Sequence, residues 1–420
     1  MSDEKPKPTL RRSLNLPMIV LYGLGTTIGG GIYVLIGHVA ARAGMLAPVS
    51  FLVAALMVAF TALTFAELSS RFPKSAGEAV YVKEGFGRND LAVLVGFLVV
   101  VNGIVSSAAL SDGMVGYLQT FLPLPAWLAI VGITIALGLL AAWGIGESVT
   151  AVAIVTVIEI AGLMIIIWVG RDEFATIAAR SHDLIPPFES VAWISILSGS
   201  FLAFYAFIGF EDMVNVAEEV KSVEKTLPVG IILTLGITTV IYFVVALVAV
   251  LSLPPQQLAE SAAPLTAIFE SKTGADPTLI TLISIFAVLN GALIQIIMAS
   301  RVLYGMSRQN MMPRQLSFLG DVNPRTQTPI KATASIILLV CILALGFSIE
   351  ALAETTSLII LIIACMVNGA LLRMKLNPRS VHDAVHAGLT VPIWVPTFGL
   401  IVSLSFAVMV FIDLVRPLSE

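Results

Sequence analysis

The stretch that interrupts the first long apolar segment of this chain reads Gly23-Leu24-Gly25-Thr26-Thr27-Ile28-Gly29-Gly30-Gly31-Ile32-Tyr33. Glycine is a poor helix former, so four glycines within the seven residues 25–31 favour local unwinding of a helix. In a lipid bilayer, unwound backbone is tolerated only where protein or a water-filled cavity receives its free N–H and C=O groups. A helix broken near the middle of a membrane therefore predicts a solute-binding site and is typical of secondary transporters.

The composition indicates that the rest of the chain also lies in a membrane. Of 420 residues, 58% are hydrophobic and only 12% are charged, and the mean hydropathy is +0.98. A soluble protein of this size could not bury so much apolar surface, so we expect an all-α protein that crosses the bilayer many times. The net charge of −4 comes without a basic patch, so no nucleic-acid partner is expected. Cys341 and Cys365 lie in separate apolar runs and fit no disulfide or metal-binding pattern.

Apolar runs long enough to cross a bilayer recur along the whole sequence. With the N-terminus on the cytoplasmic side, the cytoplasmic segments hold eighteen Lys and Arg residues and the outer segments hold five. This bias predicts a cytoplasmic N-terminus, and an odd number of spans then puts the C-terminus outside. The eleven candidate spans are about 16–41, 48–69, 91–119, 125–142, 149–169, 192–217, 230–253, 279–307, 330–347, 352–372 and 391–414.

The sixth span repeats the irregularity of the first. It contains Phe207-Ile208-Gly209-Phe210-Glu211-Asp212, with a glycine at mid-span and two carboxylates shortly after it. Interruptions five spans apart are typical of an inverted repeat, because five is odd and the two halves then enter the membrane from opposite sides. The alternative is that these glycines only allow helices to pack closely. We expect a cytoplasmic tail at 1–15, a first repeat at 16–170, a second repeat at 171–373, and a loop with an eleventh span at 374–420.

Four segments carry further motifs, in this order along the chain: Gly25 to Tyr33; Phe65-Ala66-Glu67-Leu68-Ser69-Ser70-Arg71-Phe72-Pro73 with 77–81; Phe204 to Glu211 with 217–228; and Ala299-Ser300-Arg301-Val302-Leu303-Tyr304-Gly305-Met306-Ser307-Arg308. Together they resemble the amino acid–polyamine–organocation permeases. The resemblance implies a LeuT-like fold of five plus five spans in inverted repeats, with spans one and six discontinuous. It also implies secondary transport of amino acids by alternating access through a cell (inner) membrane. Many relatives have twelve spans, whereas we expect eleven here.

The first break supplies what the carboxylate of an amino acid needs. The outer half-helix begins near Gly31, where free N–H groups and the positive end of the helix dipole favour an anion. The resemblance implies that the ammonium group binds carbonyl groups of the unwound sixth span, with help from Thr27 or Ile28. We therefore expect the substrate to contact Thr27, Ile28, Gly29, Gly30, Gly31, Ala206, Phe207, Ile208 and Gly209.

Three side chains are candidates for closing or shaping this site. The resemblance implies that Tyr205, at the position of an aromatic residue in relatives, covers the substrate and closes the path outward. The alternative is that its ring only packs against neighbouring helices, as most aromatic rings do. Ser107 in the third span and Gln295 in the eighth match pocket positions of relatives, so we expect them to contact the substrate side chain.

Glu159 lies in a segment that is apolar on every side. A charge at that depth costs about 2.5–3.5 kcal/mol on insertion scales, so a carboxyl group there needs a reason. Away from water the protonated form is favoured, and the group could take up and release a proton during transport. Several relatives carry a lysine at this position, so the glutamate suggests a proton-binding group or one that faces a cation such as Arg301. A structural hydrogen bond from a permanently protonated Glu159 is the alternative.

Other polar residues in the apolar runs have more modest interpretations. Glu211 follows the second break and is a second candidate for proton coupling, because burial also favours its protonated form. Asp112 lies nearer the outside, where it could attract a cationic substrate or line a vestibule. For the asparagines within spans we expect hydrogen bonds between helices. These are Asn102, Asn290 and Asn368.

The sequence as a whole predicts a proton-coupled symporter of amino acids, which is not an enzyme and needs no cofactor. No Gly-rich loop ends in Lys-Ser or Lys-Thr, so ATP is not the expected energy source. An amino acid/amine antiporter or a polyamine carrier is the alternative among transporters, with Asp112 and Glu211 holding the second positive charge. A membrane nutrient sensor that does not transport, or a channel, is an alternative from another class. The sequence predicts no oligomeric state.

Overall fold

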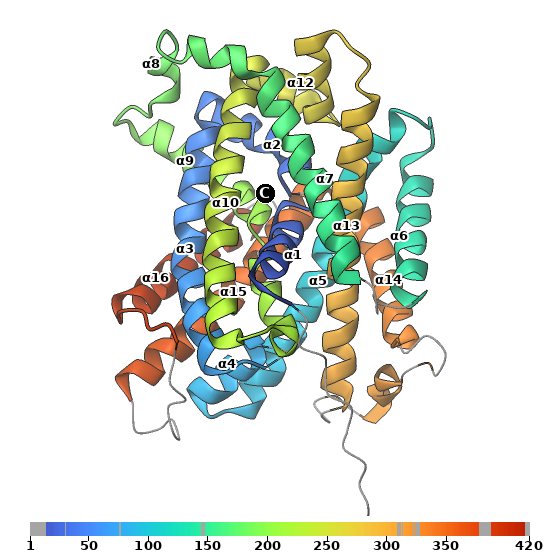
Figure 1. The fold of residues 1–420 in the computed structure, drawn as a ribbon, viewed down its shortest axis with the longest axis vertical. Coiled ribbons are helices and arrows are strands. Elements are labelled where there is room, and N and C mark those ends of the chain that lie inside the picture. The colour runs from blue at the N-terminus through green and yellow to red at the C-terminus, as the bar shows by residue number, and fades with distance from the viewer. Residues whose placement is uncertain are drawn as a thin grey trace, which may run out of the picture.

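The structure is a computed structural model, and it describes residues 14–29, 31–74, 77–143, 148–308, 312, 314–321, 323, 328–377 and 388–415. Over these residues the chain forms a single bundle of helices (Figure 1). The described part contains no strand, and its one β-bridge joins Leu14 to Val220. The expected all-α architecture is confirmed.

Long apolar helices alternate with short connecting helices along the described chain. The elements of the first half are α1 (Leu16–Ile28), α2 (Gly31–Ala43), η1 (Gly44–Leu46), α3 (Ala47–Arg71), α4 (Gly77–Phe86), α5 (Asn89–Gln119), α6 (Ala126–Trp143), α7 (Ser148–Val169), η2 (Arg171–Thr176) and α8 (Ser181–Leu184). Those of the second half are α9 (Ser190–Ala206), η3 (Phe210–Glu219), α10 (Val223–Ser252), α11 (Pro255–Glu260), α12 (Pro264–Thr273), α13 (Thr278–Arg308), η4 (Arg314–Gly320), α14 (Ile330–Gly346), α15 (Ile349–Leu376) and α16 (Trp394–Val415).

Each of the eleven predicted spans coincides with helical chain in the structure. Within the described residues, seven stretches are long and apolar enough to cross a membrane: α2 with α3, α5, α7, α9 with η3, α10, α13 and α15. Shorter apolar helices are α1, α6, α14 and α16. The number of helices that cross the bilayer, the inverted repeat and the domain boundaries stay predictions.

The local sequence explains where the helices begin and end. The Asn15 side chain accepts a hydrogen bond from the N–H of Met18 at 3.1 Å, and a proline occupies the first turn of α1. Ser348 caps α15 in the same way, since its hydroxyl accepts the N–H of Ala351 at 3.4 Å. The long helix α3 ends at Arg71, shortly before Pro73, which disfavours helical backbone in the residue ahead of it.

Helix α1 lies in the middle of the bundle, where other helices enclose it (Figure 1). It packs against α7, α10 and α13, and its residues 23–28 are all buried. Each half of the first broken span packs against one half of the second: α1 contacts η3, and α2 contacts α9. Both breaks therefore face the interior of the protein and not the surrounding lipid.

A buried ion network joins α3, α15 and the segment ahead of α16. Glu67 is fully buried, and its carboxylate pairs with Arg71 one turn further along α3. It also accepts hydrogen bonds from Lys375 Nζ at 2.8 Å and from the N–H of Val391 at 2.7 Å. A buried carboxylate needs such partners. The network therefore holds the chain that leads into α16 against the core.

Candidate substrate site

The first predicted break is present in the backbone, because α1 ends at Ile28 and α2 begins at Gly31. The N–H of Gly29 still bonds to the carbonyl of Gly25, at 3.2 Å. Gly30, also predicted to contact the substrate, lies outside the described residues. The Thr27 hydroxyl is buried and has no hydrogen-bond partner among the residues that the structure describes. Buried polar groups are normally paired, so this position lacks the partner that a polar ligand would provide.

The second break is a turn between α9 and η3, formed by Phe207, Ile208 and Gly209. Gly209 has a φ angle of 124°, a conformation that residues with a side chain rarely adopt. One carboxylate oxygen of Glu211, Oε2, accepts the N–H of Gly209 at 3.0 Å. A carboxyl group therefore lies directly against the unwound backbone of this span.

The two breaks lie side by side. A Cβ atom on Gly31 would come within 2.6 Å of the Ala206 Cα atom, and one on Gly209 within 2.5 Å of the Thr26 carbonyl oxygen. The Thr26 hydroxyl donates to the Gly209 carbonyl at 2.9 Å. These glycines are thus required by the close approach of two backbones. The residues predicted to form the substrate site, Gly30 apart, are brought together in one region.

Tyr242 of α10 joins the two breaks and is a candidate that the sequence pattern does not single out. Its hydroxyl lies 2.8 Å from the Thr27 carbonyl oxygen and 2.9 Å from the Ala206 carbonyl oxygen. A hydroxyl has one proton, so it can fully satisfy only one of these two carbonyls at a time. Its ring packs edge-on against the Phe207 ring, with 5.1 Å between the two ring centroids. The only feature of the sequence that could have pointed to Tyr242 is its position in a long apolar run. Its hydrogen-bond partners lie 36 and 215 residues away, so the sequence pattern does not identify them.

Tyr205 and Ser107 both fix helices against one another in this structure. The Tyr205 hydroxyl lies 3.2 Å from the Ser106 hydroxyl, and it also donates to the Ser106 carbonyl of α5 at 3.2 Å. The Ser107 hydroxyl donates to the Gly103 carbonyl of its own helix at 2.7 Å and lies 3.4 Å from the Ala292 carbonyl of α13. The expected gating role of Tyr205 and the expected pocket role of Ser107 stay predictions.

Gln295 of α13 is directed toward the carboxylates beside the second break. Its Nε2 donates to Asp212 Oδ2 at 2.8 Å, while its buried Oε1 has no partner within the described ranges. Glu78, at the start of α4, is a third buried acid in this area and interacts electrostatically with Glu211 and Asp212. Burial, together with the charge of Glu211, raises the pKa of Glu78 to about 8.

Glu159 of α7 is fully buried against the first broken span. Its Oε1 accepts a hydrogen bond from Asn290 Nδ2 of α13 at 2.9 Å, whereas its Oε2 has no partner in the described part of the chain. Tyr33 of α2 donates to the backbone carbonyl of Glu159 at 2.6 Å. The partner of the carboxyl group is thus an amide, and the suggested ion pair with Arg301 is wrong, since Arg301 is exposed. The expected interhelical bond of Asn290 is confirmed.

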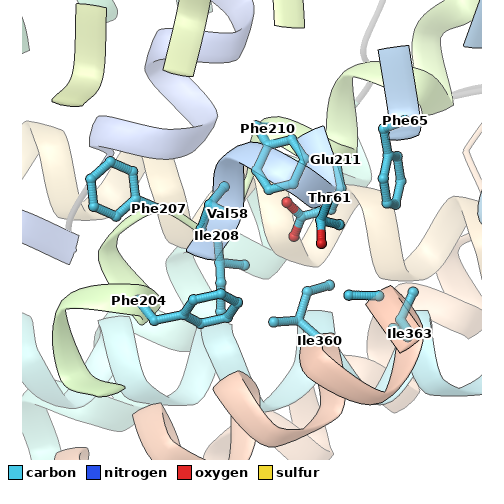
Figure 2. A pocket seen from close by; sticks show the side chains of 11 residues that line it. Val58, Thr61, Phe65, Phe204, Phe207, Ile208, Phe210, Glu211, Ile360 and Ile363 are labelled. Atoms are coloured by element: carbon cyan, nitrogen blue, oxygen red, sulfur yellow. The ribbon is translucent and has the colours of Figure 1, made fainter. Parts of the chain in front are cut away.

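A pocket opens beside the second break, between α3, the turn 207–209 with its flanks, and α15 (Figure 2). Its cavity volume is about 10 Å³, which is room for about one water molecule. Glu211 and Thr61 provide the polar side chains of its wall, and Figure 2 shows their oxygen atoms directed into the space next to Phe204, Ile208 and Ile360. The full lining is Val58, Thr61, Phe65, Phe204, Phe207, Ile208, Phe210, Glu211, Ile360, Ile363 and Ala364.

Known proteins resemble the chain over most of its length. The cationic amino acid transporter 4 (vacuolar) of Arabidopsis thaliana is 32% identical over 370 residues, which cover 83% of this chain and 60% of the transporter. The branched-chain amino acid permease BcaP of Bacillus subtilis (strain 168) is 30% identical over 353 residues, which cover 77% of this chain and 72% of the permease. The chain thus spans about 60% of the length of the plant relatives it matches.

The fold is also that of a solved structure. The crystal structure of MhsT in complex with L-phenylalanine superposes with a TM-score of 0.64 at 13% sequence identity, covering 97% of this chain and 100% of MhsT. At this identity the likeness shows the fold alone, and it confirms the expected LeuT-like class. A family model described as amino acid permease matches residues 14–418. The chain therefore belongs to the amino acid permease family.

Proposed function

We propose that this protein is a secondary transporter that carries amino acids across a membrane by alternating access, coupled to protons. The observation that carries the proposal is the contact between two unwound segments in the protein interior, with an unpartnered Thr27 hydroxyl and two carbonyls that share one tyrosine proton. Such paired breaks suit a small ligand with an acceptor group at one end and a donor group at the other.

The amino acid would lie across the two breaks. Its carboxylate binds at the start of α2, where the first N–H groups of the helix from Gly31 onward have no partner within the helix. Its ammonium group binds the carbonyls of residues 206–208 and of Thr27 or Ile28. The shared proton of Tyr242 supports this arrangement, because one of the two carbonyls is free to accept from an ammonium group. Tyr205 would cover the bound substrate, with Ser107 and Gln295 beside its side chain.

Glu159 and Glu211 are the proposed proton-binding groups. Each is buried, each has one oxygen held by a single N–H donor, and each has a second oxygen without a partner. No Lys, Arg or His side chain forms an ion pair with either of them in the described part of the chain. A buried carboxyl group without a cation is neutralised by a proton, so a change in water access would drive proton uptake and release.

Uptake into proteoliposomes tests the transport proposal. Radiolabelled amino acids are offered to vesicles that contain the purified protein, with and without an inward proton gradient. We expect accumulation of at least one amino acid above the empty-vesicle background, and greater accumulation with the gradient. The absence of uptake and of counterflow for all twenty amino acids would overturn the transport function in favour of a sensor. Uptake that ignores the gradient but requires internal substrate would favour an exchanger.

Replacing Glu159 with glutamine tests the proton role of this group. We expect Glu159→Gln to abolish the stimulation of uptake by a proton gradient while retaining counterflow. The glutamine amide has nearly the same shape as the carboxyl group but takes up no proton near neutral pH. Glu260→Gln, at an exposed acid at the end of α11, serves as the matched control and should behave as the natural chain. An unchanged gradient response in Glu159→Gln would remove Glu159 from the coupling mechanism.

The proposed location is a cell (inner) membrane, with the N-terminus in the cytoplasm. The distribution of Lys and Arg among the loops supports this orientation. BcaP comes from a bacterium, whereas the plant relatives carry vacuolar names.

A further inference from the structure

Glu78 is a buried acid on α4, the short helix that follows the second predicted span. This helix lies at one end of the bundle (Figure 1). Glu78 is only 2% exposed, whereas Lys83 and Glu84 on the same helix are exposed. One face of α4 thus packs into the protein and the other meets solvent, on the side that the charge bias assigns to the cytoplasm.

The buried face of α4 packs against η3, the second half of the broken sixth span. A Cβ atom on Gly77 would lie 2.6 Å from Val214 Cγ2, so the two elements approach closely at the start of α4. The Phe65 ring joins them, because it packs edge-on against Tyr81 of α4 and against Phe210 of η3. The ring centroids are 6.1 and 5.7 Å apart.

Three buried carboxyl groups, which we call the acid cluster, meet at this contact. Glu78 interacts electrostatically with Glu211 and Asp212 of η3, which are each 2% exposed and also interact with one another. Glu211 accepts the N–H of Gly209 at 3.0 Å, and Asp212 accepts Nε2 of Gln295 at 2.8 Å. Neighbouring carboxyl groups without a cation cannot all be ionised, so they hold protons in common.

Positively charged side chains around α4 are bound to other groups or turned to solvent. Lys83 of α4 itself and Arg301 of α13 are exposed. The described residues therefore supply no cation to the acid cluster, and protons neutralise buried carboxyl groups that lack one. The bound cations are Arg71 and Lys375 with Glu67, Arg373 with the Phe86 carbonyl, and Arg88 with Asp90.

Polar atoms without partners border the acid cluster. The Tyr81 hydroxyl is fully buried, interacts electrostatically with Glu78 and has no hydrogen-bond partner in the described part of the chain. Oε1 of Glu211 and Oε1 of Gln295 also lack a partner there. Buried polar groups are normally paired, so this set of one donor and two acceptors leaves positions that a moving proton can complete.

We propose that Glu78 is the residue through which the acid cluster exchanges its proton with the cytoplasm during transport. A proton leaves a carboxyl oxygen of Glu211 or Asp212 and binds the carboxylate of Glu78, so that one O–H bond breaks and another forms. Glu78 passes the proton to water when the contact between α4 and η3 loosens. Because η3 is a 3-10 helix, whose hydrogen bonds are poorer than those of an α-helix, this contact is suited to movement.

The pKa of Glu78 supports release of the proton at this point. Burial raises it to about 8, so the group carries a proton at neutral pH while α4 and η3 are packed together. Access of water lowers the pKa toward 4.5, and the proton then leaves. This inference rests on the proposed coupling to protons, and it adds the acid at which the proton reaches the cytoplasm.

Gradient-driven uptake and counterflow in proteoliposomes test the inference. Net symport releases a proton inside the vesicle, whereas the exchange of internal for external substrate needs no net release. We expect Glu78→Gln to lower gradient-driven uptake at least tenfold and to change counterflow less than twofold, because glutamine has no carboxyl proton. Glu84→Gln, at an exposed acid of the same helix, is the matched control and should behave as the natural chain.

Glu78→Asp separates proton exchange from a structural role. Aspartate is shorter than glutamate but keeps a carboxyl group, whereas glutamine keeps the shape and loses the proton. We expect Glu78→Asp to regain gradient-driven uptake, with a displaced dependence on the internal pH. If Glu78→Gln does not fold, Asp212→Asn interrupts the same route one carboxyl group earlier. Its amide oxygen can still accept from Gln295, and we expect the same loss of gradient-driven uptake with counterflow retained.

Two results would overturn the role of Glu78 and leave proton coupling intact. One is gradient-driven uptake that survives in Glu78→Gln, or that is better in Glu78→Gln than in Glu78→Asp. The other is an equal loss of uptake and counterflow in both Glu78→Gln and Asp212→Asn, because these acids would then only hold the fold. Natural protein whose uptake ignores the proton gradient would instead contradict the proposed coupling, and the role of Glu78 with it.

Discussion

Gly209 is the residue whose backbone decides the shape of the second break. Its φ of 124° is strained for any residue with a side chain, and an added Cβ would lie 2.5 Å from the Thr26 carbonyl oxygen. We therefore expect Gly209→Ala to lower the midpoint of thermal unfolding in detergent markedly and to abolish uptake. The strain and the clash each cost on the order of 1–3 kcal/mol.

The matched control is Gly236→Ala in α10. A Cβ at Gly236 would meet no atom within 4 Å, and the residue lies within a regular helix. Alanine is a better helix former than glycine, so this change should be neutral or slightly stabilising. If Gly209→Ala unfolds at the same temperature as Gly236→Ala, then the turn at Gly209 is not strained in the folded protein.

Tyr242 carries the single proton that joins the two breaks. We expect Tyr242→Phe to cost about 1–2 kcal/mol of stability, because a buried carbonyl of Thr27 or Ala206 loses its donor. We also expect weaker amino acid binding, since the relative position of the breaks is less well held. Thermal unfolding and equilibrium binding measure the two effects.

Tyr117→Phe separates the two effects of the tyrosine hydroxyl. The Tyr117 hydroxyl also donates to a buried carbonyl, that of Tyr33 at 2.5 Å, and among the described residues it forms no hydrogen bond with Thr27 or with the turn after α9. Tyr117→Phe should lower the free energy of unfolding by a similar amount and leave the affinity for amino acids unchanged. A Tyr242→Phe protein with unaltered binding would contradict the role assigned to this hydroxyl.

Among the helices, α4 packs against η3 after the second break, and its Glu78 interacts electrostatically with Glu211. The pKa of Glu78 is raised from 4.5 to about 8, first by burial and also by the charge of Glu211. A raised carboxyl pKa means that folding favours the protonated form. The resulting stability is fully present below pH 4.5 and is lost as the pH rises through about 8. We expect the thermal midpoint of the natural chain to fall as the pH rises from 4.5 to about 8, and this contribution to level off above that.

A glutamine at position 78 should remove this part of the pH dependence. It keeps the hydrogen-bonding shape and does not ionise, so Glu78→Gln should flatten the fall of the thermal midpoint between pH 4.5 and about 8. Glu84→Gln, at an exposed acid of the same helix, controls for the loss of one surface charge. The same fall over this pH range in Glu78→Gln and in the natural chain would show that another group titrates.

At the scale of the whole molecule, the expected topology assigns opposite sides of the membrane to loops that are both exposed. The side chains of Arg88, ahead of α5, and Arg171, after α7, are 61% and 51% exposed. The charge bias predicts that Arg88 is cytoplasmic and Arg171 is outside. In a chain with Cys341→Ala and Cys365→Ala, we expect Arg171→Cys to react with a membrane-impermeant maleimide on intact cells. Arg88→Cys should react only after permeabilisation, and the reverse pattern would invert the topology.

Several features of the fold were predictable from residue patterns alone. Apolar length located all eleven helical segments, and the glycine clusters located both breaks, because these signals depend on local backbone preference and on the thickness of a bilayer. The partner of Glu159 was not predictable. Asn290 and Arg301 lie eleven residues apart on nearly the same face of one helix, so the position of α13 along α7 determines which of them meets the carboxyl group.

Residue composition and glycine placement alone were enough to predict an all-helical membrane protein with two interrupted spans. Composition and glycine placement affect the backbone of the segment that contains them, so they can be interpreted without knowing which other helices pack against it. That the two breaks touch, that Tyr242 joins them, and that Glu211 accepts the N–H of Gly209 became known from the folded structure. The first two contacts join residues far apart in the chain, and packing of side chains sets the distances and orientations on which they depend.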